Sequence, residues 1–145
     1  MVKRISVEGY EAVKKAIDEN SKANSLFVLF CGSKDDKGQS WCPDCVSAEP
    51  VIEEGLKIAP EDSVFIYCSV GDRTYCLAGK IFKPLLQIAL NIITHNILEN
   101  PNNEFRKDEK LRLTGVPTLI KWNTVRRLDD EQCRSAALVT MLFEE

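Results

Sequence analysis

An α/β fold with a mixed central β-sheet flanked by helices is the class that the sequence predicts. Two continuous apolar runs, at 25–31 and 63–70, have the length of strands buried on both faces, and helical patterns alternate with them. Nearer the end of the chain, two short strand-like stretches around a turn precede a further helical pattern, which adds an antiparallel hairpin. With 145 residues, the chain is expected to form one domain with a complete hydrophobic core.

The first part of the chain is expected to contain three strands and two helices. A short strand at 4–7 precedes a helix at 10–20, in which apolar residues recur at helical spacing. The apolar run at 25–31 is the expected central parallel strand. A polar loop follows it and leads into a helix over 43–58, and the second buried strand, at 63–70, ends at a turn.

The last part is expected to add a short helix, a hairpin and a final helix. The helix at 104–110 is rich in charge, which indicates a solvated face. A strand at 118–122 turns into its hairpin partner at 125–128, and a last helix follows over 130–143. The predicted order of elements is therefore β-α-β-α-β-α-β-β-α.

The overall composition excludes several broad classes of protein. Charged residues make up 28% of the chain and hydrophobic residues 44%, and the formal net charge is -3. This balance argues against nucleic acid or an anionic membrane surface as a partner. The most apolar stretch, 81–98, is interrupted by polar residues and is not expected to cross a bilayer. Charge at Glu8 and Glu11 replaces the apolar stretch of a secretory signal, so the expected compartment is the cytosol.

The chain contains six cysteines. Cytosolic thiols are kept reduced, so these residues are expected to be reactive, metal-bound or simply buried rather than paired as a structural framework. Cys31, Cys68 and Cys133 fall at apolar positions and are expected to behave as small buried hydrophobes. Cys76 is a candidate third redox thiol. His95, the only histidine, has no cysteine beside it and is interpreted as a surface residue.

The strongest local signal is a CxxC motif, Cys42-Pro43-Asp44-Cys45, between a buried strand and the start of a helix. The N-terminus of a helix presents free N–H groups and a partial positive charge, which stabilise a thiolate. This placement predicts Cys42 as the nucleophile. Cys45 lies one helical turn further in, close enough to displace a mixed disulfide, and is the expected resolving thiol.

The two residues between the cysteines are expected to tune the redox pair. Pro43 suits the first helical position, where its missing N–H costs nothing. The carboxylate of Asp44 favours the helix end but opposes a thiolate at Cys42, which indicates a reductant rather than a strong oxidant. A CxxC motif can also be half of a zinc site, but no second ligand pair stands at a suitable spacing, so we expect no metal.

A second motif lies far downstream, where Val116-Pro117 precedes the strand expected at 118–122. A proline cannot donate to a strand ladder, so it belongs at a strand start or in a turn, where a cis peptide bond can form. Together with the CxxC motif, it makes the chain resemble the thioredoxin superfamily, in which a cis-proline loop faces the redox pair and binds substrate backbone.

The resemblance narrows to one branch, the thioredoxin domain-containing protein 17 family. The matching stretches cover nearly the whole chain outside one segment, and they are Gly32-Ser33-Lys34-Asp35, Ser40-Trp41-Cys42-Pro43-Asp44-Cys45, Ala48-Glu49-Pro50, Glu54-Gly55-Leu56-Lys57, Val64-Phe65-Ile66-Tyr67-Cys68, Asn100-Pro101-Asn102-Asn103, Val116-Pro117-Thr118-Leu119 and Met141-Leu142-Phe143. The resemblance implies a thioredoxin fold and a cytosolic protein-disulfide reductase with no bound cofactor, recharged by thioredoxin reductase with electrons from NADPH. It also implies disulfide-containing proteins and small disulfides such as cystine as targets, and a role in peroxide defence.

Residue by residue, the resemblance implies the same roles for the CxxC motif. Cys42 is the nucleophile, Cys45 is the resolving thiol, and Pro43 and Asp44 tune the redox potential. The resemblance also implies that Trp41 and the Val116-Pro117 bond bind substrate. Lys34 and Asp35 lie in a loop before the motif, whose greater length is a feature of this family. These two residues are expected either to help select targets by charge or to belong to a merely solvated loop.

One thioredoxin feature is missing from the predicted central strand. The run 25–31 contains no buried aspartate to accept the proton of the resolving cysteine. A water molecule or Asp44 is therefore expected to accept it.

The family pattern breaks between Tyr75 and Asn100. The segment 76–99 contains few charged residues, and after Pro84 it has an amphipathic helical pattern. A retained or mispredicted intron, translated in frame, is the interpretation that we favour. The other is a genuine apolar helical insertion between the third strand and third helix, at the end of the sheet where it would cover Trp41 or recruit a partner.

Two alternatives to an active reductase stay open at the level of sequence. In one, the same fold is a redox-responsive binding module that docks a signalling or motor-associated protein and uses the CxxC motif as a switch. In the other, the chain is an isoform of the reductase that the segment 76–99 impairs.

Overall fold

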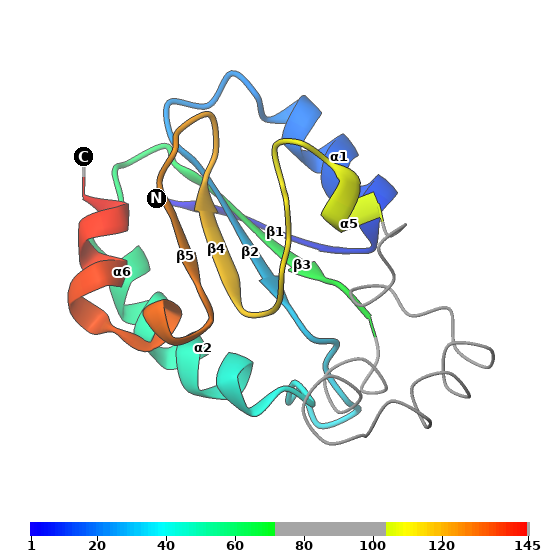
Figure 1. Cartoon of the computed structure of the whole chain (residues 1–145). Coiled ribbons are helices and arrows are strands. Elements are labelled where there is room, and N and C mark those ends of the chain that lie inside the picture. Colours follow the sequence, from blue (N-terminus) through cyan, green and yellow to red (C-terminus); the bar gives the residue numbers. More distant parts are fainter. Residues whose placement is uncertain (72–103, 145) are drawn as a thin grey trace, which may run out of the picture.

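The computed structural model of the chain describes residues 1–71 and 104–144 (Figure 1). The segment 76–99, with Cys76 and His95, lies outside the described residues. The helices and strands, in chain order, are β1 (Lys3–Glu8), α1 (Tyr10–Glu19), β2 (Leu26–Cys31), α2 (Pro43–Leu56), β3 (Val64–Ser69), α5 (Glu104–Lys107), β4 (Thr118–Lys121), β5 (Arg127–Asp129), the short 3-10 helix η1 (Asp130–Arg134) and α6 (Ala136–Phe143).

The strands form one mixed sheet in the order β1-β3-β2-β4-β5. β1 and β2 run parallel to β3, whereas β4 is antiparallel to both β2 and β5. Helices α1 and α5 cover one face of this sheet and α2 and α6 the other (Figure 1). This is the thioredoxin fold that the sequence predicts.

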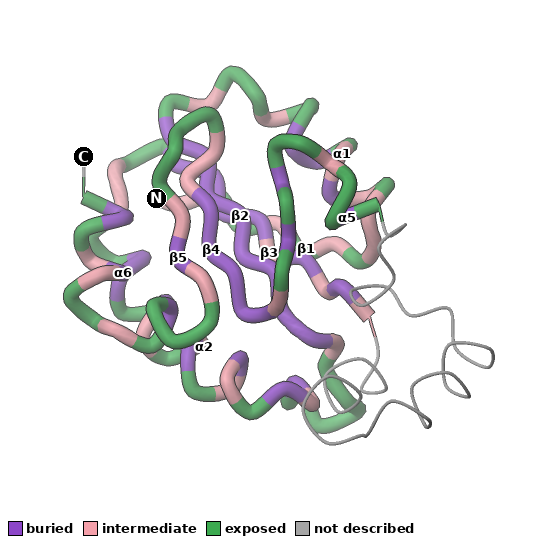
Figure 2. Tube along the Cα trace, in the orientation of Figure 1, coloured by how far each residue is buried: buried purple, intermediate pink, exposed green. Residues whose placement is uncertain are grey.

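The core is built around β2, in which all six residues are buried (Figure 2). Alternate side chains of a strand point to opposite faces, so β2 packs against both helical layers. The ring of Phe27 lies 4.7 Å from that of Phe143 in α6. On the other face, the ring of Phe30 lies 5.9 Å from that of Phe105 in α5. The prediction of a central strand buried on both faces is confirmed.

Two predictions for the end of the chain are wrong in detail. The hairpin partner begins at Arg127 and not at residue 125, because Asn123 has a left-handed φ of 61° and the turn closes through a hydrogen bond from the Lys121 N–H to the Arg126 carbonyl. The single helix expected over 130–143 is two helices. Ser135 separates them, since its hydroxyl accepts a hydrogen bond from the Leu138 N–H and caps α6.

The helix expected at 104–110 is also shorter, and it ends at Lys107. The carboxylate of Asp108 accepts hydrogen bonds from the N–H groups of Lys110 and Leu111, which form a turn in place of a further helical turn. The other carboxylate oxygen accepts hydrogen bonds from Tyr10 and Lys14 of α1, at 2.9 and 3.0 Å. The turn that follows α5 is therefore hydrogen-bonded to α1, so this part of the chain is not only a solvated face.

Asp108 makes the stability of this packing depend on pH. Burial alone would raise its pKa, but the hydrogen bonds from Lys14, Tyr10 and the backbone outweigh burial and lower the pKa to about 2. A carboxyl with a lowered pKa stabilises the fold above its unfolded pKa of 3.8, and this stabilisation is lost as the pH falls toward 2. We expect Asp108→Asn to cost about 2 kcal/mol at neutral pH and progressively less below pH ~4, as urea unfolding would measure. A cost that stays constant down to pH ~3 would show that the ionised Asp108 carboxylate is not the source of this stabilisation.

The packing of α2 on α6 depends on a glycine. A Cβ atom added at Gly55 would lie 2.7 Å from Val139 and 2.8 Å from Phe143, closer than real contacts allow. An alanine ordinarily stabilises a helix interior by about 1 kcal/mol relative to glycine, whereas overpacking a core costs about 1–3 kcal/mol. We therefore expect Gly55→Ala to destabilise the protein by about 1–3 kcal/mol in chemical denaturation. Ser47→Ala, at an exposed position of the same helix, is the control and should leave stability unchanged or slightly higher.

Among the described residues, no helix is both long enough and apolar enough to span a membrane.

Candidate redox site

The CxxC motif lies where the chain passes from β2 into α2. Cys42 has an extended backbone, with φ -85° and ψ 112°, and is the N-cap of α2, and Pro43 occupies the first turn. The hydroxyl of Ser40 donates a hydrogen bond to the Gly32 carbonyl and accepts one from the Cys42 N–H, at 2.9 and 3.3 Å. Cys42 thus occupies the helix N-terminus that the sequence predicts for it.

Trp41 closes one side of the motif. Its indole N–H donates a hydrogen bond to the Gly71 carbonyl at 2.9 Å, and its ring packs directly on the backbone of Gly32. A Cβ atom at Gly32 would lie 2.6 Å from this ring, so only glycine permits the contact. The ring is therefore held beside the end of β2.

The second predicted motif meets the first. The Val116-Pro117 peptide bond is cis, and the Cys42 thiol donates a long hydrogen bond to the Val116 carbonyl, with Sγ and O 3.9 Å apart. Cys42 is only 1% exposed. Its sulfur is therefore covered by neighbouring groups.

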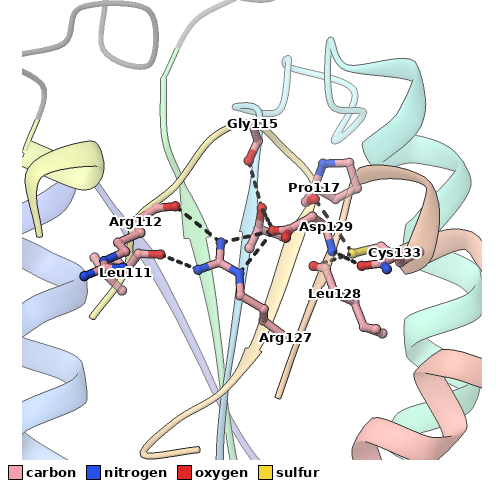
Figure 3. A network of polar contacts seen from close by, with 10 residues as sticks. Leu111, Arg112, Gly115, Pro117, Arg127, Leu128, Asp129 and Cys133 are labelled. Atoms are coloured by element: carbon pink, nitrogen blue, oxygen red, sulfur yellow. Dashed lines mark hydrogen bonds and ion pairs between the residues drawn. The ribbon is translucent and has the colours of Figure 1, made fainter. Parts of the chain in front are cut away.

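Arg127 of β5 forms hydrogen bonds with residues that flank the loop with the cis bond (Figure 3). Its guanidinium donates hydrogen bonds to the Leu111 carbonyl at 2.8 Å and to the Asp129 carboxylate at 3.0 Å. Asp129 also accepts a hydrogen bond from Thr118, and the Asp130 N–H donates to the Pro117 carbonyl at 2.8 Å. These bonds fix both sides of the loop relative to the end of the sheet.

Cys45 lies in the interior, with its thiol fully buried. The thiol shares hydrogen bonds with the thiols of Cys31 and Cys42. The bond with Cys31, then the bond with Cys42 and burial raise the pKa of Cys45 far above its ordinary range. Both hydrogen bonds and burial therefore favour the neutral, protonated form of the Cys45 thiol.

Cys31 is buried, as the sequence predicts, but it is more than a small hydrophobe. Besides Cys45, its thiol contacts the hydroxyl of Tyr67 through a hydrogen bond. That hydroxyl donates a hydrogen bond to the Glu49 carboxylate, at 3.3 Å. Burial, together with the neighbouring Cys31 and Glu49, raises the pKa of Tyr67 well above its ordinary value. A polar path therefore leads away from Cys45 through the core, and the apolar pattern of the sequence did not indicate it.

Asp44 has a partner that the sequence did not reveal. Its carboxylate lies 3.7 Å from the guanidinium of Arg134 in η1, which also faces Glu131 at 3.6 Å. The negative charge that was expected to act on Cys42 is therefore partly balanced by an arginine from the end of the chain. No local pattern joins these two residues, because their contact arises from the packing of η1 against α2.

Lys34 and Asp35 both have partners within the chain. The Lys34 ammonium lies 3.1 Å from Glu49 and 4.9 Å from the centre of the Tyr67 ring. The Asp35 carboxylate accepts hydrogen bonds from the N–H groups of Lys37 and Gln39 and so shapes its own loop. Their expected role in selecting targets stays a prediction.

Of the remaining described cysteines, Cys133 contacts the cis-proline loop, since its thiol lies 3.7 Å from the Pro117 carbonyl oxygen, whereas Cys68 bonds to the Gly9 carbonyl. Cys68 and Cys133 are fully buried, and burial raises the pKa of each to about 12. Within residues 1–71 and 104–144, no group of three or more histidine, cysteine or acidic side chains is arranged to hold a metal ion.

Comparison with known families agrees with this geometry. The family profile described as "Thioredoxin domain-containing protein 17-like, thioredoxin domain" matches residues 6–82 and 85–145. The chain belongs to this family. The thioredoxin domain-containing protein 17 of Mus musculus is 44% identical over 141 residues, which are 97% of this chain and 94% of that protein. That of Homo sapiens is 42% identical over the same shares of the two chains.

A plant relative extends the family. The thioredoxin-like protein Clot of Arabidopsis thaliana is 36% identical over 130 residues, 87% of this chain and 81% of that protein. Membership of the thioredoxin domain-containing protein 17-like family confirms the resemblance that the motifs carry, and with it the thioredoxin fold.

Proposed function

We propose that this member of the family is a thiol-disulfide oxidoreductase that acts as a protein-disulfide reductase in the cytosol. The observation that carries the proposal is the arrangement of two thiols in contact. Cys42 lies at the N-terminus of α2, and Cys45 lies behind it, hydrogen-bonded to it. A thiolate at a helix N-terminus is a nucleophile, and a second thiol in contact with it can complete an exchange.

The reaction runs in two steps. The Cys42 thiolate attacks one sulfur of a target disulfide, and the other sulfur leaves as a thiolate, so that a mixed disulfide remains on Cys42. Cys45 then loses its proton and attacks Cys42 Sγ, which releases the reduced target and forms the Cys42–Cys45 disulfide. Two electrons pass from the dithiol to the target. We propose that the Val116 carbonyl, 3.9 Å from Cys42 Sγ, orients the backbone of a bound target beside Trp41.

The oxidised pair must be reduced before the next cycle. We propose that thioredoxin reductase supplies the two electrons from NADPH, and that cystine and selected protein disulfides are the targets. Disulfides formed by peroxide would be among these targets, which would give the protein a role in peroxide defence.

NADPH oxidation tests the proposal directly. Thioredoxin reductase and the full chain are mixed with cystine or with a protein disulfide such as insulin, and absorbance of NADPH is followed. We expect oxidation that is proportional to the concentration of the chain and absent with the reductase alone. No oxidation above that background with either substrate would contradict the proposal and would leave a binding role or an impaired isoform.

A further inference from the structure

The resolving step poses a problem that the thioredoxin fold alone does not solve. Cys45 is fully buried, and its thiol must give up a proton before it can attack the mixed disulfide. All six residues of β2 are buried and none is an acid. Asp44 is one candidate acceptor, and its carboxylate faces Arg134. The groups that hydrogen-bond to the Cys45 thiol are the others.

Cys31 is placed to receive this proton. It is the last residue of β2, and its thiol is hydrogen-bonded to that of Cys45. In the parallel register, Leu29 pairs with Tyr67 and Cys31 with Ser69, so Cys31 and Tyr67 are diagonal neighbours on the face that α2 covers. The pairing explains why the Tyr67 hydroxyl reaches the Cys31 thiol.

The path continues to solvent at Glu49. The Tyr67 hydroxyl donates to the Glu49 carboxylate at 3.3 Å, and Glu49 also pairs with Lys34 at 3.1 Å. The Glu49 side chain is 29% exposed. Tyr67 and Lys34 line an open cleft of about 530 Å³ between β1, β3 and α2, which gives water access to this end of the path.

We propose that Cys31, Tyr67 and Glu49 form a proton relay that deprotonates Cys45 while it resolves the mixed disulfide. The Cys45 proton moves to Cys31 Sγ, the proton of Cys31 moves to the Tyr67 oxygen, and the Tyr67 proton moves to the Glu49 carboxylate. The sulfur–sulfur bond to the target breaks as the Cys42–Cys45 bond forms, and the electron pair leaves on the target thiolate. Glu49, whose side chain is 29% exposed, then passes the proton to water, and every relay group returns to its starting state.

Lys34 positions the outer end of this relay. Its ammonium holds the Glu49 carboxylate beside Tyr67 and lies over the Tyr67 ring.

The relay rests on the proposed reductase function, so the test separates the two steps of exchange. Reduced full chain is mixed rapidly with dithiobis(nitrobenzoate), whose coloured thiol is released once on attack by Cys42 and once on resolution by Cys45. The phase that is missing in Cys45→Ser is the resolving step. If the chain has no rapid attack phase, the proposed function itself fails, whatever the relay does.

Substitutions of the relay are expected to slow only the resolving phase. We expect Cys31→Val and Tyr67→Phe each to slow this phase by roughly 100-fold, the lower end of the range for positioned proton transfer. Cys31→Ser should restore part of the rate, because a hydroxyl can also pass a proton. The solvent deuterium isotope effect on the resolving phase should fall in Cys31→Val and remain in Cys31→Ser, which a purely structural role would not produce.

Cys68→Val is the matched control. Cys68 is another fully buried thiol, but it bonds to the Gly9 carbonyl and lies on the face of the sheet that α1 covers. The Cys68→Val substitution should leave the attack phase, the resolving phase and the isotope effect unchanged. A resolving phase within about two-fold of the original in both Cys31→Val and Tyr67→Phe would overturn the relay. Loss of the isotope effect in Asp44→Asn alone would assign the proton to Asp44 instead and would also overturn it.

Tyr67→Phe keeps the test decisive if Cys31→Val fails to fold. Tyr67 is only partly buried, and this substitution removes one hydroxyl without changing the ring. An unchanged resolving phase in folded Tyr67→Phe would by itself exclude passage of the proton through Tyr67.

Discussion

Replacement of Cys42 by serine is expected to abolish disulfide reduction. A serine hydroxyl at the N-terminus of α2 is not ionised at neutral pH, so it cannot replace a thiolate as the attacking group. NADPH oxidation in the coupled assay should fall to the rate seen without the protein. The fold should be unaffected, because the side chains have nearly the same size and the Val116 carbonyl can accept a hydrogen bond from either.

Cys45→Ser gives the complementary result. Cys42 still attacks, but the mixed disulfide is not resolved, so a target protein should remain covalently attached and be visible by mass spectrometry under non-reducing conditions. Cys68→Ser, in which another buried thiol is changed, should trap nothing. A Cys42→Ser variant that still consumes NADPH would show that a different thiol carries the reaction.

The fold and the position of the CxxC motif were predictable because their signals are local. The apolar run of β2 is continuous, so it indicated a strand buried on both faces without knowledge of its neighbours. Pro43 after Cys42 marks the first turn of a helix, and this placed Cys42 at its N-terminus. Pro117 ahead of a strand indicated a turn, and the turn meets Cys42 in the structure. Each of these predictions needed only a few consecutive residues.

The supporting groups of the site were not predictable for the opposite reason. The contact of Arg134 with Asp44 depends on how η1 packs against α2, and the contact of Tyr67 with Cys31 depends on the register of two parallel strands. A shift of that register by one residue would turn Tyr67 to the other face of the sheet. Neither the packing of η1 against α2 nor the register of β2 and β3 can be predicted from a single sequence. The same holds for α6, since only the capping bond at Ser135 reveals where it begins.

One aromatic side chain anchors α5 on the face of the sheet opposite the CxxC motif. α5 spans only Glu104–Lys107, and a helix of this length is not stable alone. Phe105 is its one buried residue, at 2% exposure, and it packs edge-on against Tyr10 at 5.6 Å and against Phe30 at 5.9 Å. This ring joins α5 to both α1 and the central strand.

Phe105→Ala is therefore expected to lower the free energy of unfolding by about 3–5 kcal/mol, the usual cost of removing a buried aromatic ring. The cavity would lie between α1 and β2, and the Tyr10 hydroxyl would lose its fixed position beside Asp108. Urea unfolding at neutral pH measures the loss. Arg106→Ala, at an exposed position of the same helix, should change stability by less than about 0.5 kcal/mol. If Phe105→Ala costs no more than Arg106→Ala, Phe105 does not anchor α5, and the stability of that element must come from the Asp108 hydrogen bonds alone.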